Sequence, residues 1–215
     1  MKHLLLSLSV LLLAPALRAD VPGAPGPELV VGENDAAWRP LFDALAAQGA
    51  VYSTFTEHRW FSVRKEPVVL QGELRHAAER GLSLRYLQPE EQVLVVDAQG
   101  LLMRNAQGRT RSMAADPRAP RIDAALLPVL RFDLAALLKL FSLRAARDGA
   151  DWRLDFSPRT PELARTLSVL TVEGSGEAVR RLEFRRSAKQ RVEVLIKETR
   201  TGVTFSADEV KRFFR

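Results

Sequence analysis

Residues 72–105 read GELRHAAERGLSLRYLQPEEQVLVVDAQGLLMRN, and three short runs in this stretch alternate apolar with polar side chains. A spacing of two places alternate side chains on one face of a β-strand, so the runs predict three strands with one apolar face. Compact turns at Gln88–Glu91 and Asp97–Gly100 separate the runs. Proline cannot donate a ladder hydrogen bond and glycine tolerates a positive φ, so both residues favour turns. The stretch therefore predicts an antiparallel meander.

The apolar side chains of this meander are the first candidates for a binding surface. Those expected on its apolar face are Leu82, Leu84, Tyr86, Val93, Val95, Leu101 and Met103. Such a face either packs against a solid core or, in a partly closed β structure, lines a cavity for an apolar ligand. Periodicity alone does not distinguish the two arrangements.

The first 19 residues have the pattern of a secretory signal. Lys2 and His3 precede an apolar run over residues 4–13, and small residues follow as far as Ala19. The run is shorter than the roughly 20 residues that a membrane-spanning helix requires. We expect cleavage after Ala19, with Ala16 as the alternative, and export of the remaining chain. A chain that has no cysteine suits a bacterial periplasm.

The remainder of the chain predicts one domain that is mainly β, of the α+β kind. Residues 20–34 are rich in proline and glycine and predict a flexible lead-in to a single domain over 35–215. A helix is expected over 40–48, and short helices within 116–141. Alternating segments elsewhere predict about ten antiparallel strands. The expected architecture is a strongly curved antiparallel sheet, or incomplete β-barrel, with a helical lid.

The helices expected in the middle of the chain are apolar over a wide arc. A surface helix needs only one apolar stripe, so these helices are expected to lie against an apolar surface. The side chains expected to face the sheet are Leu126, Leu130, Leu137 and Phe141.

No residue pattern in the sequence predicts catalysis. His58 and His76, the histidines outside the signal, lack metal-ligand spacing to a second ligand. No nucleophile elbow, phosphate loop or zinc motif is present. We therefore expect a protein that is not an enzyme and has no metal and no cofactor. The net charge of +6 suits transient contact with anionic membrane surfaces better than nucleic acid, because the chain is expected to be exported.

Five segments carry a resemblance to a known family. They are Phe55–Glu57, Gly72–Leu74, Leu82–Leu84, Gln88–Glu91 and Val93–Asn105. In them the chain resembles the LolA-like periplasmic carriers of outer-membrane lipoproteins. The resemblance implies a monomer that takes acylated lipoproteins from an inner-membrane exporter, holds their acyl chains between sheet and lid, and passes them to an outer-membrane acceptor. Each buried methylene contributes about 0.8 kcal/mol, so acyl chains are held without a covalent step.

The chain departs from the family pattern in the predicted meander. The family has an Arg-Pro pair before a Phe-x-Trp, whereas this chain has Ala78-Glu79 and then Leu82-x-Leu84. The resemblance links the family arginine with lid closure and cargo handover, and Arg80 is the candidate to replace it. Because Arg80 lies at a different register, other functions stay open. These are a carrier of another acylated envelope molecule (a glycolipid or polyene lipid), a ligand-free envelope interaction module, and a hydrolase with an unrecognised site.

Overall fold

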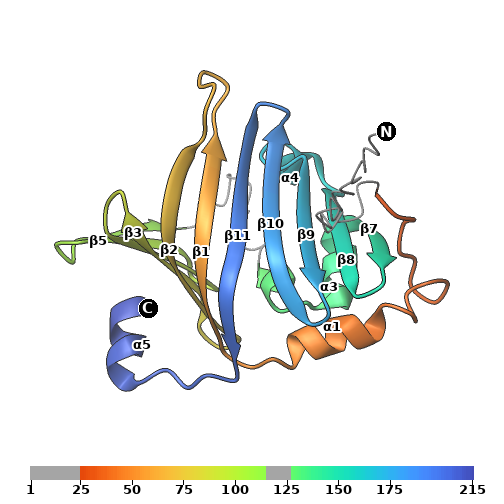
Figure 1. Ribbon diagram of the computed structural model, residues 1–215, viewed down its shortest axis with the longest axis horizontal. Coiled ribbons are helices and arrows are strands. Elements are labelled where there is room, and N and C mark those ends of the chain that lie inside the picture. The colour runs from red at the N-terminus through yellow and green to blue at the C-terminus, as the bar shows by residue number, and fades with distance from the viewer. Residues whose placement is uncertain (1–24, 115–126) are drawn as a thin grey trace, which may run out of the picture.

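The computed structural model describes residues 25–114 and 127–215, which contain eleven antiparallel strands in one open sheet. The strand order is β6-β5-β4-β3-β2-β1-β11-β10-β9-β8-β7, so the first and last strands pair at the centre and β6 and β7 form the edges (Figure 1). The predicted fold class is confirmed: the molecule is mainly β, and its antiparallel sheet is not closed. The sheet has eleven strands rather than about ten.

About half of the described chain lies in strands, which are joined mostly by short turns. The strands are β1 (Val51–Trp60), β2 (Val68–Ala77), β3 (Gly81–Gln88), β4 (Gln92–Asp97), β5 (Gly100–Asn105), β6 (Thr110–Ala114), β7 (Phe141–Asp148), β8 (Asp151–Pro158), β9 (Val169–Ser175), β10 (Ala178–Ser187) and β11 (Gln190–Thr201). The helices are α1 (Arg39–Ala46), α3 (Leu134–Leu140), α4 (Pro161–Ala164) and α5 (Ala207–Phe213), and residues 127–130 are also helical. Within the described residues, no helix is both long and apolar enough to cross a membrane.

The sheet has two faces of different character. Directly paired residues of neighbouring antiparallel strands point to the same side, so the register assigns every strand residue to a face. We call the face that carries Phe55, Tyr86 and Leu154 the inner face, because α1 and α3 pack against it. The opposite face, which carries Val95 and Arg181, is called the outer face.

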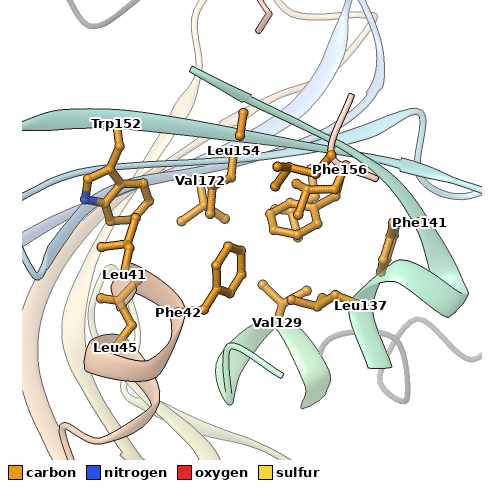
Figure 2. Packing of buried hydrophobic residues seen from close by; sticks show 14 of the residues in the cluster. Leu41, Phe42, Leu45, Val129, Leu137, Phe141, Trp152, Leu154, Phe156 and Val172 are labelled. Atoms are coloured by element: carbon orange, nitrogen blue, oxygen red, sulfur yellow. The ribbon is translucent and has the colours of Figure 1, made fainter. Parts of the chain in front are cut away.

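The β7–β10 half of the inner face is packed solid. Trp152, Leu154 and Phe156 of β8 are at most 1% exposed. Figure 2 shows side chains of α1, among them Phe42, pointing towards these strand residues, together with Val129 and Leu137 from the helices that follow. Aromatic and branched side chains interlock here at the density of a protein interior, so this half is a structural core.

Two glycines make room for aromatic rings on the inner face. A Cβ on Gly72 of β2 would lie 2.8 Å from the ring of Phe55, and one on Gly174 of β9 would lie 2.2 Å from the ring of Trp152. In each case a ring covers the neighbouring glycine, an arrangement that pins strand register. Gly72 thereby fixes Phe55 beside Tyr86, with their ring centroids 5.6 Å apart.

The described part of the expected flexible lead-in, residues 25–34, is held against the β7 edge. The Leu29 amide donates to the Leu143 carbonyl at 2.7 Å, and the Ala145 amide donates to the Pro27 carbonyl at 3.1 Å. The side chain of Asn34 closes the following turn through the amide of Val30 and the carbonyl of Glu28. Pairing with an edge strand satisfies backbone groups here that would otherwise be open, and the expectation of a flexible lead-in stays a prediction.

Helix α5 covers part of the outer face. Phe213 and Phe214 pack against Val93 and Val95 of β4 and against Leu102 of β5. The expectation that Val93 and Val95 line the same face as Leu82 is therefore wrong. The register pairs Val95 with Ser83, and neighbouring strand positions such as Ser83 and Leu82 point to opposite sides.

A network of ion pairs covers the outer face of β8–β11. Arg181 of β10 contacts Glu173 of β9 at 3.0 Å, Glu193 of β11 at 2.5 Å, and Glu183 on its own strand. Glu173 and Glu183 are 4% and 3% exposed. Burial raises the pKa of Glu193, but hydrogen bonds from Arg181 and His58 outweigh it and hold that pKa below its ordinary value. Arg181 therefore compensates three carboxylates that would otherwise repel one another.

Replacing the α5 anchor tests how strongly the helix is held. Phe214→Ala is expected to lower the free energy of unfolding by about 3–5 kcal/mol, because a fully buried ring is removed. Phe61→Ala is the matched control, since that ring is 43% exposed and its loss is expected to change stability by less than about 0.5 kcal/mol. Urea unfolding measures both, and equal losses would contradict the packing of α5.

The ion-pair network predicts a pH-dependent stability. Arg181→Met is expected to cost about 1–3 kcal/mol at neutral pH, because three carboxylates each lose one of their two partners. The native stabilisation of Glu193 is present above its unfolded pKa of about 4.5 and is lost as pH falls through its lower folded pKa. The gap between wild type and variant, followed by denaturant unfolding, should therefore narrow below pH 4.5. A gap that stays constant with pH would show that the network is not the cause.

Candidate apolar binding site

A cavity of about 260 Å³ lies on the inner face, next to the packed half. It lies between the C-terminal end of α1, the turn that follows residues 127–130, and the strands at the centre of the sheet. Apolar side chains that line it from the sheet are Val51, Leu74, Leu82, Val172, Val179, Leu182 and Ile196. Those that line it from the helical side are Leu45, Val129, Leu130 and Phe132.

The apolar surface continues from the cavity along the inner face. Phe55, Tyr86 and Val194 are buried at its centre. Partly buried apolar side chains surround them: Leu70, Leu74, Leu84, Leu94, Leu182, Phe184, Val192 and Ile196. We call this set the apolar strip. It extends from the α1 and α3 core, which Leu182 and Phe184 also contact, as far as β4, so its outer members keep some exposure.

Polar groups at the cavity wall are paired with one another. The hydroxyls of Ser53 and Thr199, on neighbouring strands, lie 3.1 Å apart in a hydrogen bond. The side chain of Gln48 donates to the carbonyl of Glu177. Because these groups are satisfied within the protein, they present little unpaired polarity to a ligand in the cavity.

Residues 127–132 cover the cavity on its helical side and are called the roof. The roof ends in a strained turn. Phe132 has a φ of 51°, a left-handed conformation that is rare for a bulky side chain. The amide of Asp133 donates to the Pro128 carbonyl at 3.1 Å, which closes the end of the short helix. The same geometry turns the ring of Phe132 against Phe42 of α1, with centroids 6.3 Å apart. Strain of this kind is typical of ligand-clamping segments.

Arg131 connects this roof to the sheet. Its guanidinium donates to the carbonyl of Ala78, in the β2–β3 turn, at 3.0 Å. His76, at the end of β2, lines the cavity beside it. Burial, followed by the positive charge of Arg131, holds the pKa of His76 below its ordinary value, so the imidazole is neutral at neutral pH. The cavity wall is therefore uncharged at this position.

A polar cluster lies within the apolar strip. The hydroxyl of Tyr86 donates to Glu57 at 2.8 Å and accepts from Arg59 at 3.1 Å, and Arg59 also pairs with Glu57. Glu57 and Tyr86 are each 2% exposed. Burial and then the charge of Glu57 raise the pKa of Tyr86 well above its ordinary value, so the phenol stays protonated. The carboxylate is paired and its burial is compensated.

The structure brings some of the predicted binding residues together at this site. Leu82 and Leu130 both line the cavity, one from the sheet and one from the roof. Leu84 pairs with Leu94, and Leu94 pairs with Met103, so Leu84 and Met103 share the face of Leu82. Tyr86 and Leu101 lie on the same face by the same register.

Other predicted residues lie elsewhere. Leu137 and Phe141 are fully buried in the core beneath α3 and do not line the cavity, so the expectation that they face an open space is wrong. They sit where α3 meets β7 and β8, and the packing there leaves no room. Val93 and Val95 face α5, as described above. Leu126 falls outside the described residues.

Arg80 does not contact the roof. It lies in the exposed β2–β3 turn and its nearest charged partner is Glu79 at 3.6 Å. The arginine that joins roof and sheet is Arg131, which the sequence reasoning missed. The neighbouring Asp133, an N-cap residue for α3, was a signal that a helix-connecting turn lies here. Leu182 and Ile196 were missed as well, although the period-two pattern of β10 and β11 places them on one face.

Among the residues that the structure describes, no group of histidine, cysteine and carboxylate side chains is arranged to hold a metal ion. What the described arrangement offers is a mainly apolar volume with the Arg131 guanidinium at its edge, and an apolar surface beside it. Such a site binds through burial of apolar surface.

Solved structures similar to this chain come from several bacteria, and no curated protein matches it in sequence. The MucA/MucB complex of Pseudomonas aeruginosa matches with 19% identity and a TM-score of 0.44, over 81% of this chain and 59% of that chain. This chain thus spans less than two thirds of that one. A LolA superfamily protein from Nitrosomonas europaea matches with 7% identity and a TM-score of 0.42, over 80% and 96%. LprF from Mycobacterium bovis matches with 11% identity and a TM-score of 0.33, over 78% and 95%.

The family model of the LolA-like outer membrane lipoprotein carrier proteins matches residues 33–207. This range begins before α1 and reaches the start of α5, so it contains the whole sheet and the cavity. The chain therefore belongs to the family of LolA-like outer membrane lipoprotein carrier proteins.

Proposed function

We propose that this protein is a periplasmic carrier that holds acyl chains of lipoproteins in the cavity and along the apolar strip. The observation that supports this most strongly is the cavity itself, which is lined by Leu82, Ile196 and other apolar side chains. An acyl chain has no charge and few hydrogen-bonding groups, so it fits a wall that is mainly apolar. Binding in this way needs no metal, cofactor or catalytic step.

The volume of the cavity limits how much of a cargo molecule enters it. Its 260 Å³ lies just below the roughly 300–1,000 Å³ of common small-molecule pockets. We infer that part of one acyl chain fits the cavity as it stands, and that the remainder lies along the apolar strip or enters after the roof moves. At about 0.8 kcal/mol for each buried methylene, a long chain is still held firmly.

The roof is held to the sheet by one weak polar contact and to the core by the packing of Val129 and Phe132. Arg131 holds it to the sheet by one exposed hydrogen bond, which contributes about 0.5–1.5 kcal/mol. Such a contact breaks far more readily than the packing beneath α3. We infer that the roof opens at an inner-membrane exporter, closes over the cargo, and opens again at an outer-membrane acceptor. Transfer requires partners that bind the two states differently.

Identification of the cargo tests the proposal directly. Protein purified from the periplasm is examined by native mass spectrometry and its bound lipid is extracted. Release of a labelled lipoprotein from inner-membrane vesicles is then measured with and without the protein. Acylated cargo together with protein-dependent release supports the lipoprotein carrier. Release of a glycolipid or polyene lipid alone would show that this lipid, and not a lipoprotein, is the cargo. The absence of any bound lipid would overturn the proposal of a carrier.

A charge placed in the cavity is expected to abolish apolar binding. Ile196→Glu puts a carboxylate on the cavity wall, and desolvating it opposes the entry of an acyl chain. The affinity for a fluorescent fatty acid should fall at least tenfold, since desolvation of a charge costs more than about 1.4 kcal/mol. Val31→Glu, at an exposed position, is the control and should bind normally. Similar binding by both variants would contradict the site.

Binding is also expected to weaken in acid. As pH falls below the ordinary histidine pKa of 6.5 and through the lower pKa of His76, a second positive charge appears in the wall beside Arg131. The charged form disfavours both the folded roof and an apolar ligand, so affinity falls with pH. His76→Leu should flatten the pH profile while leaving affinity at neutral pH near that of wild type. Fluorescent fatty-acid titrations between pH 5 and 8, the range in which histidines change charge, measure this.

A further inference from the structure

Exposed apolar side chains gather at the hairpin between β1 and β2. Val63, near its tip, is 91% exposed, and Phe61 is 43% exposed. Val69, at the start of β2, is 49% exposed. Apolar side chains this exposed are unusual at a solvated loop tip, where small or polar residues are more common. The hairpin therefore offers a small apolar surface that the described residues do not cover.

Cations surround this apolar tip. Arg64 and Lys65 follow Val63 in the same hairpin, and all three are exposed. Arg186 and Lys189 are exposed in the neighbouring β10–β11 hairpin. Within the described part of the chain, these four cations form no ion pair with a carboxylate. Glu66 is the acidic residue of the β1–β2 loop, so the charge of this end is strongly positive.

The two hairpins belong to one surface. Trp60 of β1 pairs with Arg191 of β11, and the guanidinium of Arg191 lies 4.0 Å from the centre of the Trp60 ring. Figure 1 shows both hairpins at the same end of the sheet, with α1 at the other end. We call this end, defined by residues 60–69 and 185–191, the basic tip.

The basic tip lies at the opposite end of β1 from the cavity. The cavity is lined by Val51 at the start of β1, whereas Trp60 is at its end. Ten strand residues at about 3.3 Å each separate the two by roughly 30 Å. A partner bound at the basic tip thus leaves the cavity end free.

We propose that the basic tip docks on the surface of an anionic phospholipid bilayer. Val63 and Phe61 enter the interfacial region, while Arg64, Lys65 and the cations of the second hairpin lie at the level of the phosphate groups. Aromatic rings such as that of Trp60 favour the same depth. Lysine and arginine extend apolar stems while their charged ends stay at the phosphates. Docking of this kind is weak and reversible, and it is independent of what the cavity holds.

The charge argues against a second copy of the chain as the occupant. Two basic tips placed together would bring eight unpaired cations into contact, which costs free energy unless anions intervene. An anionic bilayer instead supplies a dense layer of phosphate at a negative potential. The alternation of apolar and cationic side chains over a few residues also matches a bilayer interface, where the two environments lie a few ångströms apart.

Vesicle binding by the full chain tests the proposal. We expect co-sedimentation with vesicles that contain phosphatidylglycerol, little with phosphatidylcholine alone, and loss of binding as salt rises. The double substitution Arg64→Gln/Lys65→Gln should weaken binding about twenty-fivefold, because each cation near an anionic surface contributes roughly a fivefold factor. Arg109→Gln/Arg111→Gln, which removes two exposed cations from the β5–β6 hairpin, is the matched control and should bind as wild type does.

Insertion is measured with a probe at the tip. The chain has no cysteine, so Val63→Cys carries a single environment-sensitive fluorophore, and Gln107→Cys in the β5–β6 turn carries the control label. With phosphatidylglycerol vesicles the label at 63 should shift to the blue and be quenched by spin-labelled lipid, while the label at 107 should not. Ile196→Glu should bind vesicles normally, which separates docking from cargo binding.

Three outcomes would overturn the proposal. Vesicle binding without any change at the label on residue 63 would place the contact on another face. Equal loss of binding in the two double-cation variants would mean that net charge alone drives it. Concentration-dependent self-association that Val63→Ser abolishes, in the absence of vesicle binding, would make the basic tip an interface between copies of the chain.

Discussion

The pairing of β1 with β11 is the constraint on which the rest of the molecule depends. It joins the first strand to the last at the centre of the sheet, so the chain must end β6 at one edge and begin β7 at the other. The described part of the connection, residues 127–140, packs on the inner face. An apolar roof over one side of the sheet is thus a consequence of strand order, and the outer face is left to α5 and to charged pairs.

One half of the inner face is packed solid and a cavity lies beside it, because the helices that cover this face are short. At 1.5 Å per residue, α1 and α3 are about 12 and 10 Å long, whereas eleven strands spaced by about 4.8 Å span roughly 48 Å. The helices cover the β7–β10 half, where Phe42 and Leu137 fill the space against β8 and β9. Beyond them the apolar strip continues with less cover. The cavity lies at this boundary, where the roof turns back at Phe132.

The period-two pattern of the sequence was sufficient to predict the strands and to predict which side chains of β3 share a face. Polar Ser83 and Arg85 alternate with Leu82, Leu84 and Tyr86, and the register confirms the shared face. It was not sufficient for β4, whose run Val93–Val96 is apolar at every position, so the pattern does not say which pair faces inward. The outer pair is covered by Phe213 and Phe214, which are more than a hundred residues away. Packing between distant segments decides which side chains of β4 face inward. The local alternation of residues carries no information about that packing.

One arginine joins roof and sheet by a hydrogen bond. It is Arg131, on the roof, and not Arg80, the candidate from the sequence. The β2–β3 turn contributes the acceptor, the carbonyl of Ala78, while Arg80 nearby points to Glu79. Arginine stays charged at all physiological pH values and a backbone carbonyl does not titrate, so this hydrogen bond has no pH dependence of its own. His76, beside Arg131, does titrate, and its positive charge repels that of the arginine. Protonation of His76 in the cavity wall therefore acts on ligand binding and on roof closure together.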